Sequence, residues 1–121
     1  EILLLKKYKK NYERFDIVVI NYKNSKLIKR IIGLPGEHIR YENNSLYING
    51  MKQEENFINT TTEYFDIKNM NYDVIPKDYY FVVGDNRINS NDSRKIGLVK
   101  EDNIEGVVWF ELSSSGLERV E

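Results

Sequence analysis

The sequence predicts an all-β fold of short antiparallel strands, arranged as a barrel or a sandwich. Runs rich in valine, isoleucine and tyrosine alternate with clusters of asparagine, glycine and serine that favour turns. No window of 11 residues carries the apolar stripe of 3.6-residue period that an amphipathic helix requires. A chain of 121 residues suits one domain, so we expect residues 1–121 to form a single unit.

Turn signals separate the expected strands. Asn24-Ser25 lies between the first two, which are therefore expected to form a hairpin, and Asn49-Gly50 is a strong hairpin signal. Gly33–Gly36 breaks the ladder as a backbone turn. Residues 51–74 show no clear period and are expected to form an extended excursion. In order, we expect strands at residues 15–20, 27–32, 37–41, 46–48, 79–83 and 104–112.

Composition excludes several classes of function. With 18 basic and 19 acidic residues the net charge is −1, so the chain lacks the basic surplus of a nucleic-acid binder, and no nucleic-acid partner is expected. The absence of cysteine excludes thiolate catalysis. His38 is the single histidine and is expected to lie on the surface, which argues against a Ser-His-Asp triad and a multi-histidine metal site. We therefore expect no metal and no cofactor.

Lys29 is the first candidate for chemistry because it interrupts an apolar strand. Alternation along the strand places it with Leu27 and Ile31 on one face and turns Arg30 to the other, where Arg30 is expected to be solvated if Lys29 is functional. Burial lowers the pKa of a lysine and yields a neutral amine able to act as a general base. The alternative is an edge-strand lysine whose amine reaches water, and spacing alone favours that alternative.

The polar segment 84–94 is the second candidate. Asp92 and Arg94 could form an ion pair that fixes this loop, and Ser90 or Ser93 could exchange a proton with a nearby base. A surface turn rich in turn-forming residues is an equal alternative on composition. The carboxylates outside this segment, Glu54, Glu55, Glu63 and Asp66, are expected to be solvated.

Two motifs together resemble a known family. Lys29–Gly36 reads Lys-Arg-Ile-Ile-Gly-Leu-Pro-Gly and is similar to the lysine box of type I signal peptidases, and Gly84–Arg94 resembles their final box. Arg14–Val18 is similar to a third box, in which Phe15 replaces a glycine. The resemblance implies an all-β fold of antiparallel sheets forming a partly open barrel or sandwich. It also implies a serine peptidase, without cofactor, that cleaves signal peptides from exported preproteins.

The resemblance assigns roles to particular residues. Lys29 matches the general base of a Ser-Lys dyad, and Ser90 matches the serine that hydrogen-bonds the lysine amine. Asp92 and Arg94 match the pair that supports the loop, and Asp85 matches an architectural position. The family implies an enzyme anchored in the cell membrane, with its catalytic domain on the extracytoplasmic face and signal peptides and the lipid surface as its partners.

The chain also departs from this family. Its nucleophile motif, Ser-Met-x-Pro, does not occur here, and Ile88 and Ile96 replace an acid and an aromatic residue in the final box. We therefore expect a fragment without nucleophile or membrane anchor, inactive alone. A non-catalytic signal-peptidase-like assembly or chaperone factor, for instance in pilus building, is the alternative. A self-cleaving repressor-type Ser-Lys protease is a third, weaker one, against which segments 84–87 and 51–74 argue. Oligomeric state does not follow from the sequence.

Overall fold

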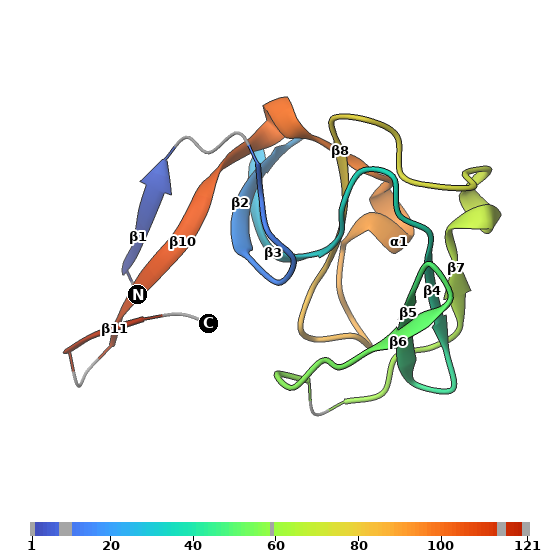
Figure 1. Ribbon diagram of the computed structural model, residues 1–121. Coiled ribbons are helices and arrows are strands. Elements are labelled where there is room, and N and C mark those ends of the chain that lie inside the picture. The colour runs from blue at the N-terminus through green and yellow to red at the C-terminus, as the bar shows by residue number, and fades with distance from the viewer. Residues whose placement is uncertain (1, 8–10, 59, 114–115, 120–121) are drawn as a thin grey trace.

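Two antiparallel sheets form the fold (Figure 1). The computed structural model describes residues 2–7, 11–58, 60–113 and 116–119, and the side chains of 11–58 and 60–108. Over these residues the two sheets do not close into a barrel, so the all-β prediction is confirmed and the open arrangement is the one present.

The larger sheet has seven strands in the order β1-β10-β2-β3-β8-β9, with β11 paired to β10. Figure 1 shows β1, β10 and β11 extending away from the second sheet. The strands are β1 (Ile2–Lys7), β2 (Ile17–Tyr22), β3 (Ser25–Gly33), β8 (Tyr79–Val83), β9 (Val99–Lys100), β10 (Ile104–Ser113) and β11 (Gly116–Arg119). The predicted β2–β3 hairpin is present, and β1, β9 and β11 were not predicted.

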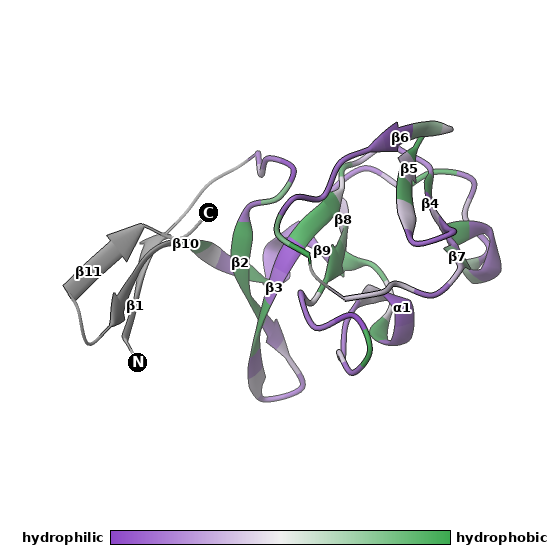
Figure 2. Ribbon diagram, turned by 90° about the horizontal axis from the view of Figure 1, so that it is seen from below, coloured by the Kyte–Doolittle hydropathy of each residue, from purple (hydrophilic) through white to green (hydrophobic). Residues whose placement is uncertain are grey.

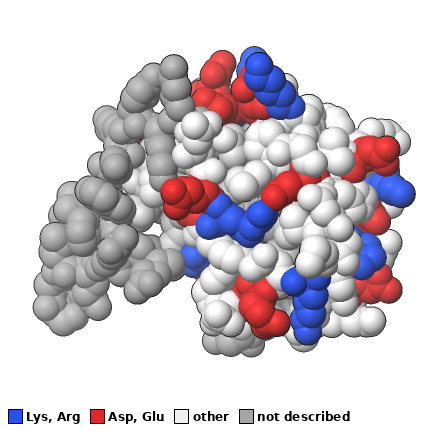
Figure 3. All heavy atoms as spheres, viewed as in Figure 1, with Lys and Arg blue, Asp and Glu red and all other residues white. Residues whose placement is uncertain are grey.

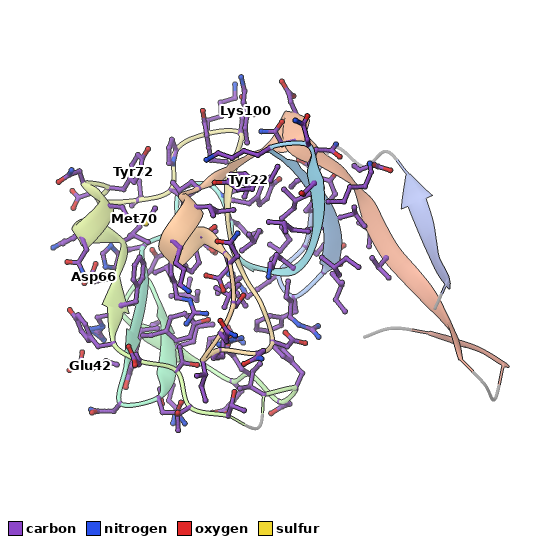
Figure 4. All side chains as sticks on the ribbon, turned by 180° about the vertical axis from the view of Figure 1, so that it is seen from behind. Tyr22, Glu42, Asp66, Met70, Tyr72 and Lys100 are labelled. Atoms are coloured by element: carbon purple, nitrogen blue, oxygen red, sulfur yellow. The ribbon has the colours of Figure 1, made fainter. Side chains whose placement is uncertain are left out.

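The smaller sheet has four strands in the order β6-β5-β4-β7. Its strands are β4 (Ile39–Glu42), β5 (Ser45–Ile48), β6 (Met51–Gln53) and β7 (Phe65–Asp66). Both outer strands, β6 and β7, come from residues 51–74, whose sequence shows no period. Figure 4 shows Asp66, Met70 and Tyr72 along that edge, where β7 continues into the 3-10 helix η1 (Ile67–Met70).

Two-residue turns of asparagine and glycine set the hairpin registers. Between β2 and β3 both Lys23 and Asn24 have positive φ, 46° and 62°, and Tyr22 pairs with Ser25. Positive φ at both central positions is the type I′ geometry, whose twist matches that of the flanking strands. The turn lies one residue earlier than predicted, which leaves Ser25 in β3.

The larger sheet has an apolar cluster on each face, which explains its continuous apolar runs. On β8, Tyr80 and Val82 point into one cluster, whereas Phe81 and Val83 point into the other. Figure 2 shows hydrophobic residues along β2, β3 and β8. On β3, Ile31 belongs to the first cluster and Ile32 to the second. Lys29 therefore shares the face of Ile31, as predicted, and Arg30 points toward the second cluster and the smaller sheet.

Phe15, which stands where the resembling family has glycine, has a φ of 74°. This left-handed backbone costs a residue with a Cβ atom about 1–2 kcal/mol. The ring packs edge to face on Phe57, with centroids 4.9 Å apart. The backbone is also held, because Phe15 N donates to Ile31 O at 2.7 Å.

We expect the free energy of unfolding to be about 1 kcal/mol larger for Phe15→Gly than for Phe15→Ala, because glycine adopts this positive φ without a Cβ clash. Both substitutions remove the ring contact with Phe57, so the difference between them reports the relief of backbone strain less the extra conformational entropy that glycine gives the unfolded chain. Urea denaturation of the two variants measures it. Equal stabilities would contradict the prediction, because the strain relieved would then be no larger than the entropy cost of glycine.

Candidate active site

Lys29 and Ser90 meet although 61 positions separate them. The Lys29 Nζ atom lies 3.1 Å from Ser90 Oγ and donates a hydrogen bond to it. β3 carries Lys29, and the loop between β8 and the short helix α1 (Ser93–Ile96) carries Ser90, which is 6% exposed. The side-chain pair expected from the resemblance is therefore in hydrogen-bond contact.

Gly84 makes this approach possible. A Cβ atom added to Gly84 would lie 2.1 Å from Ser90 Oγ and 3.3 Å from Lys29 Nζ. The hydroxyl of Ser90 occupies the space that any side chain at position 84 would need. A residue without Cβ at the end of β8 is therefore a requirement of the Lys29–Ser90 contact.

Asp92 organises the loop around Ser90. Its fully buried carboxylate accepts hydrogen bonds from Gly84 N at 3.0 Å and from Arg94 Nη2 at 2.8 Å. It also caps α1, because its side chain accepts from Arg94 N. The predicted Asp92–Arg94 ion pair is present. The helix itself was not predicted, since residues 86–97 were expected to form an irregular loop.

Burial alone would raise the pKa of Asp92, but hydrogen bonds from Arg94, Ser90 and Gly84 lower it below its ordinary value. Asp92 is thus an anion at neutral pH. The Ser90 hydroxyl oxygen accepts the hydrogen bond from Lys29 Nζ.

The environment of Lys29 favours a neutral amine. Burial lowers the pKa of Lys29, the carboxylate of Asp92 partly opposes this, and the guanidinium of Arg94 lowers it again. A lysine with a lowered pKa is a stronger candidate for a proton acceptor near neutral pH than an exposed one. The alternative of a freely solvated edge-strand lysine does not fit this half-buried side chain.

Arg30 is not solvated, which corrects the expectation for the residue beside Lys29. It is 4% exposed, and its guanidinium forms a bidentate pair with Asp85 at 3.0 and 2.7 Å. It also lies over the ring of Phe57, 3.9 Å from the centroid. The register of β3 sends Arg30 toward the smaller sheet, where a charge needs a partner. Asp85 provides one from the start of the loop.

A second buried ion pair was missed. Arg87 has a fully buried side chain that pairs with Glu55 at 2.8 Å, and Glu55 was expected to be solvated. Tyr41 joins them, because its hydroxyl donates to Glu55 and accepts from Arg87. No local pattern signals a pair separated by 32 positions. Only the presence of Arg87 within the final box could have marked it.

His38 and Asp66 also differ from the expectation of a solvated surface. The His38 Nε2 atom lies 3.1 Å from Asp66 Oδ1, and Nδ1 lies 2.7 Å from the backbone oxygen of Asp73. Both side chains are mostly covered, at 22% and 14% exposed. This contact ties the start of β4 to η1, and it lies among residues other than those around Lys29.

Ile88, the residue that replaces an acid in the loop, has a side chain exposed to solvent. It is 74% exposed and, with Tyr64 and Lys95, lines a cavity of about 260 Å³ beside Ser90. Acidic and basic side chains are interspersed over the face seen in Figure 3. Within the described residues, no group of three or more potential metal ligands occurs, and no helix is long and apolar enough to cross a bilayer.

The open, two-sheet β fold holds the amine of Lys29 against the buried Ser90. The family model described as "Signal peptidase, peptidase S26" matches residues 1–112, so the chain belongs to the signal peptidase family.

The comparisons with individual proteins agree. The chain is 41% identical to signal peptidase IB of Staphylococcus aureus, over 81% of this chain and 59% of that protein. It is 44% identical to signal peptidase I V of Bacillus subtilis, over 82% and 66%. The crystal structure of a signal peptidase I from Enterococcus faecalis matches with a TM-score of 0.77 and 36% identity, covering 82% of this chain and 97% of that one. The chain thus spans about three fifths of the length of the S. aureus relative.

Proposed function

We propose that this chain is the catalytic domain of a peptidase that cleaves signal peptides from exported preproteins, with Lys29 as its general base. The observation that carries the proposal is the 3.1 Å contact between Lys29 Nζ and Ser90 Oγ in a half-buried setting. The nucleophilic serine comes from a segment outside these 121 residues, so the domain alone is inactive. The full-length enzyme works at the extracytoplasmic face of the cell membrane.

In this mechanism the neutral Lys29 amine keeps its lone pair for the reaction. One N–H of the amine donates to Ser90 Oγ, and this contact fixes the direction of the amine. The lone pair takes the proton of the nucleophilic serine as its oxygen attacks the scissile carbonyl. The amine then gives that proton to the leaving nitrogen. In the second half, Lys29 activates the water that hydrolyses the acyl-enzyme.

The test of this proposal is cleavage of a preprotein by the full-length protein. We expect a single product whose new N-terminus lies at the signal-peptide junction, as read by mass spectrometry. Substitution of the nucleophilic serine by alanine is expected to abolish the product. A full-length protein that contains no serine at that place, or that leaves the preprotein intact, would instead support a non-catalytic assembly or chaperone role.

Gly84→Ala is expected to lower the rate of cleavage by at least ~100-fold, because the new methyl group displaces the Ser90 hydroxyl from Lys29. The matching measurement is a double-mutant cycle with Ser90→Ala. Since Gly84→Ala already removes the Ser90 contact, adding Ser90→Ala should reduce the rate much less than it does in the wild type. Full, independent effects of the two substitutions would contradict this account of Gly84.

A further inference from the structure

One short segment, residues 55–58, holds the two arginines that flank the candidate active site. It follows β6 and belongs to the stretch whose sequence shows no period. Figure 1 shows the chain beyond β6 running toward the loop between β8 and α1. From this segment Glu55 binds Arg87, and Phe57 covers Arg30.

Glu55 neutralises an arginine that has no access to water. The Arg87 side chain is 0% exposed, and its guanidinium donates to Glu55 at 3.1 Å from Nη1 and 2.8 Å from Nη2. Thr62 and Tyr41 accept further hydrogen bonds at 3.2 and 3.1 Å. A buried guanidinium without its carboxylate is strongly unfavourable. The conformation of Arg87 therefore depends on Glu55.

Arg87 in turn fixes both ends of the turn that leads to Ser90. Its Nε donates to the backbone oxygen of Gly84 at 2.9 Å, and its own backbone oxygen accepts from Arg94 Nη1 at 3.0 Å. Arg94 is paired with Asp92, which contacts Ser90. A continuous set of hydrogen bonds thus runs from Glu55 to Asp92, whose pKa is lowered by the Ser90 hydroxyl that orients Lys29.

Phe57 contacts Arg30 in β3, the strand that carries Lys29. Its ring lies against the Arg30 guanidinium and packs on Phe15. Arg30 follows Lys29 directly in β3 and pairs with Asp85, the residue after Gly84. The ring covers the Arg30 guanidinium, whose side chain is 5% exposed, while the Asp85 carboxylate is 46% exposed. Phe57 therefore fixes the arginine half of this ion pair.

We propose that residues 55–58 form a clasp that positions the Ser90 loop against Lys29, with Glu55 and Phe57 as positioning residues. Neither touches the reacting atoms, and both act through the arginines that they hold. This inference rests on the proposed function, and it gives a role in catalysis to residues outside the two motifs that resemble the family.

The test uses the full-length enzyme carrying Glu55→Gln, with Glu54→Gln as the matched control. Glu54 is the neighbouring carboxylate, exposed to solvent. We expect Glu55→Gln to lower kcat about 10- to 100-fold with little change in KM, because the base is misplaced while substrate contacts remain. We also expect the midpoint of its pH–rate profile to move about 0.5–1 unit upward, as a looser loop exposes Lys29 to water. Glu54→Gln should match the wild type in both.

A role in stability alone would give a different result. Glu55→Gln would then unfold at lower temperature but keep the wild-type kcat and pH midpoint when assayed well below its melting temperature, which would overturn the clasp. Should Glu55→Gln fail to fold, Phe57→Leu decides, because it keeps most of the apolar volume and removes the ring over Arg30. The same shifts in kcat and pH midpoint are expected of it, and wild-type values would overturn the proposal.

A second readout separates failure of the clasp from failure of the proposed function. Competitive acetylation of Lys29 over a range of pH, followed by mass spectrometry, measures the pKa of its amine without any substrate. We expect this pKa to be higher in Glu55→Gln than in wild type and Glu54→Gln. If the wild-type protein cleaves nothing, the proposed function fails, and the acetylation result alone supports or overturns the clasp.

Discussion

Replacing Lys29 with alanine in the full-length protein is expected to reduce cleavage of a signal-peptide substrate by about 1000-fold or more. The substitution removes the proton acceptor that activates the nucleophile, and no other described side chain takes its place beside Ser90. The fold is expected to persist, because the Ser90 hydroxyl keeps its contact with Asp92. Initial rates on a fluorogenic signal peptide measure the loss, and far-UV circular dichroism checks the fold.

The control is Lys23→Ala, which removes an exposed lysine from the same hairpin and should leave the rate unchanged. Unchanged turnover in Lys29→Ala would overturn the assignment of Lys29 as base.

The wild-type rate should also depend on pH in one direction. Because protonated Lys29 cannot accept a proton, the rate should rise with pH through the pKa of Lys29, which lies below the ordinary 10.5.

Asp92→Ala is expected to lower the free energy of unfolding by about 3–5 kcal/mol, the typical cost of breaking a buried ion pair. The substitution leaves Arg94 without its carboxylate and Gly84 N without its acceptor, and it removes the cap of α1. For a domain of this size we expect the melting temperature to fall by about 10–20 °C. Differential scanning calorimetry measures it.

An exposed pair supplies the control for Asp92. Asp102, 81% exposed, lies 3.9 Å from Lys100, and such surface pairs contribute little. Asp102→Ala should therefore melt close to the wild type. If Asp92→Ala melted there too, the carboxylate would have no part in holding the loop.

The stability contributed by Asp92 should also vary with pH. Its pKa is lower in the folded than in the unfolded protein, so the folded state binds protons less readily. The contribution is complete above the ordinary value of 3.8 and is lost as the pH falls through the lower, folded value. Denaturation at pH 6 and at pH 3 should accordingly show a loss of stability in the wild type that is smaller in Asp92→Ala.

Strands and turns were predictable because they depend on neighbours in sequence. The alternation along β3 placed Lys29 and Ile31 on one face, and the asparagine turns followed from residues that tolerate positive φ. The helix α1 was missed because four residues are too few to show a helical period. That residues 1–121 form one unit stays a prediction.

The site was predictable only in part, for a related reason. Spacing could nominate Lys29 but not Ser90 as its partner, since the contact joins residues 61 positions apart. The family resemblance supplied that pairing, whereas the pair of Glu55 and Arg87 had no signal of either kind. Side chains that are far apart in the sequence and meet only in the folded chain show no periodic pattern that would predict their contact.

The two-residue turn between β2 and β3 constrains more than the shape of a hairpin. Lys29 and Arg30 are adjacent basic residues whose side chains point to opposite faces of β3. Lys29 contacts Ser90, whereas Arg30 contacts Asp85 and Phe57. A change of one residue in the length of this hairpin would exchange the faces to which these two side chains point. A permanently charged guanidinium would then lie beside Ser90, where the proposed mechanism requires a neutral amine. Under the proposed function, selection should therefore act on the number of residues between Val18 and Lys29 as strictly as on the identity of the lysine.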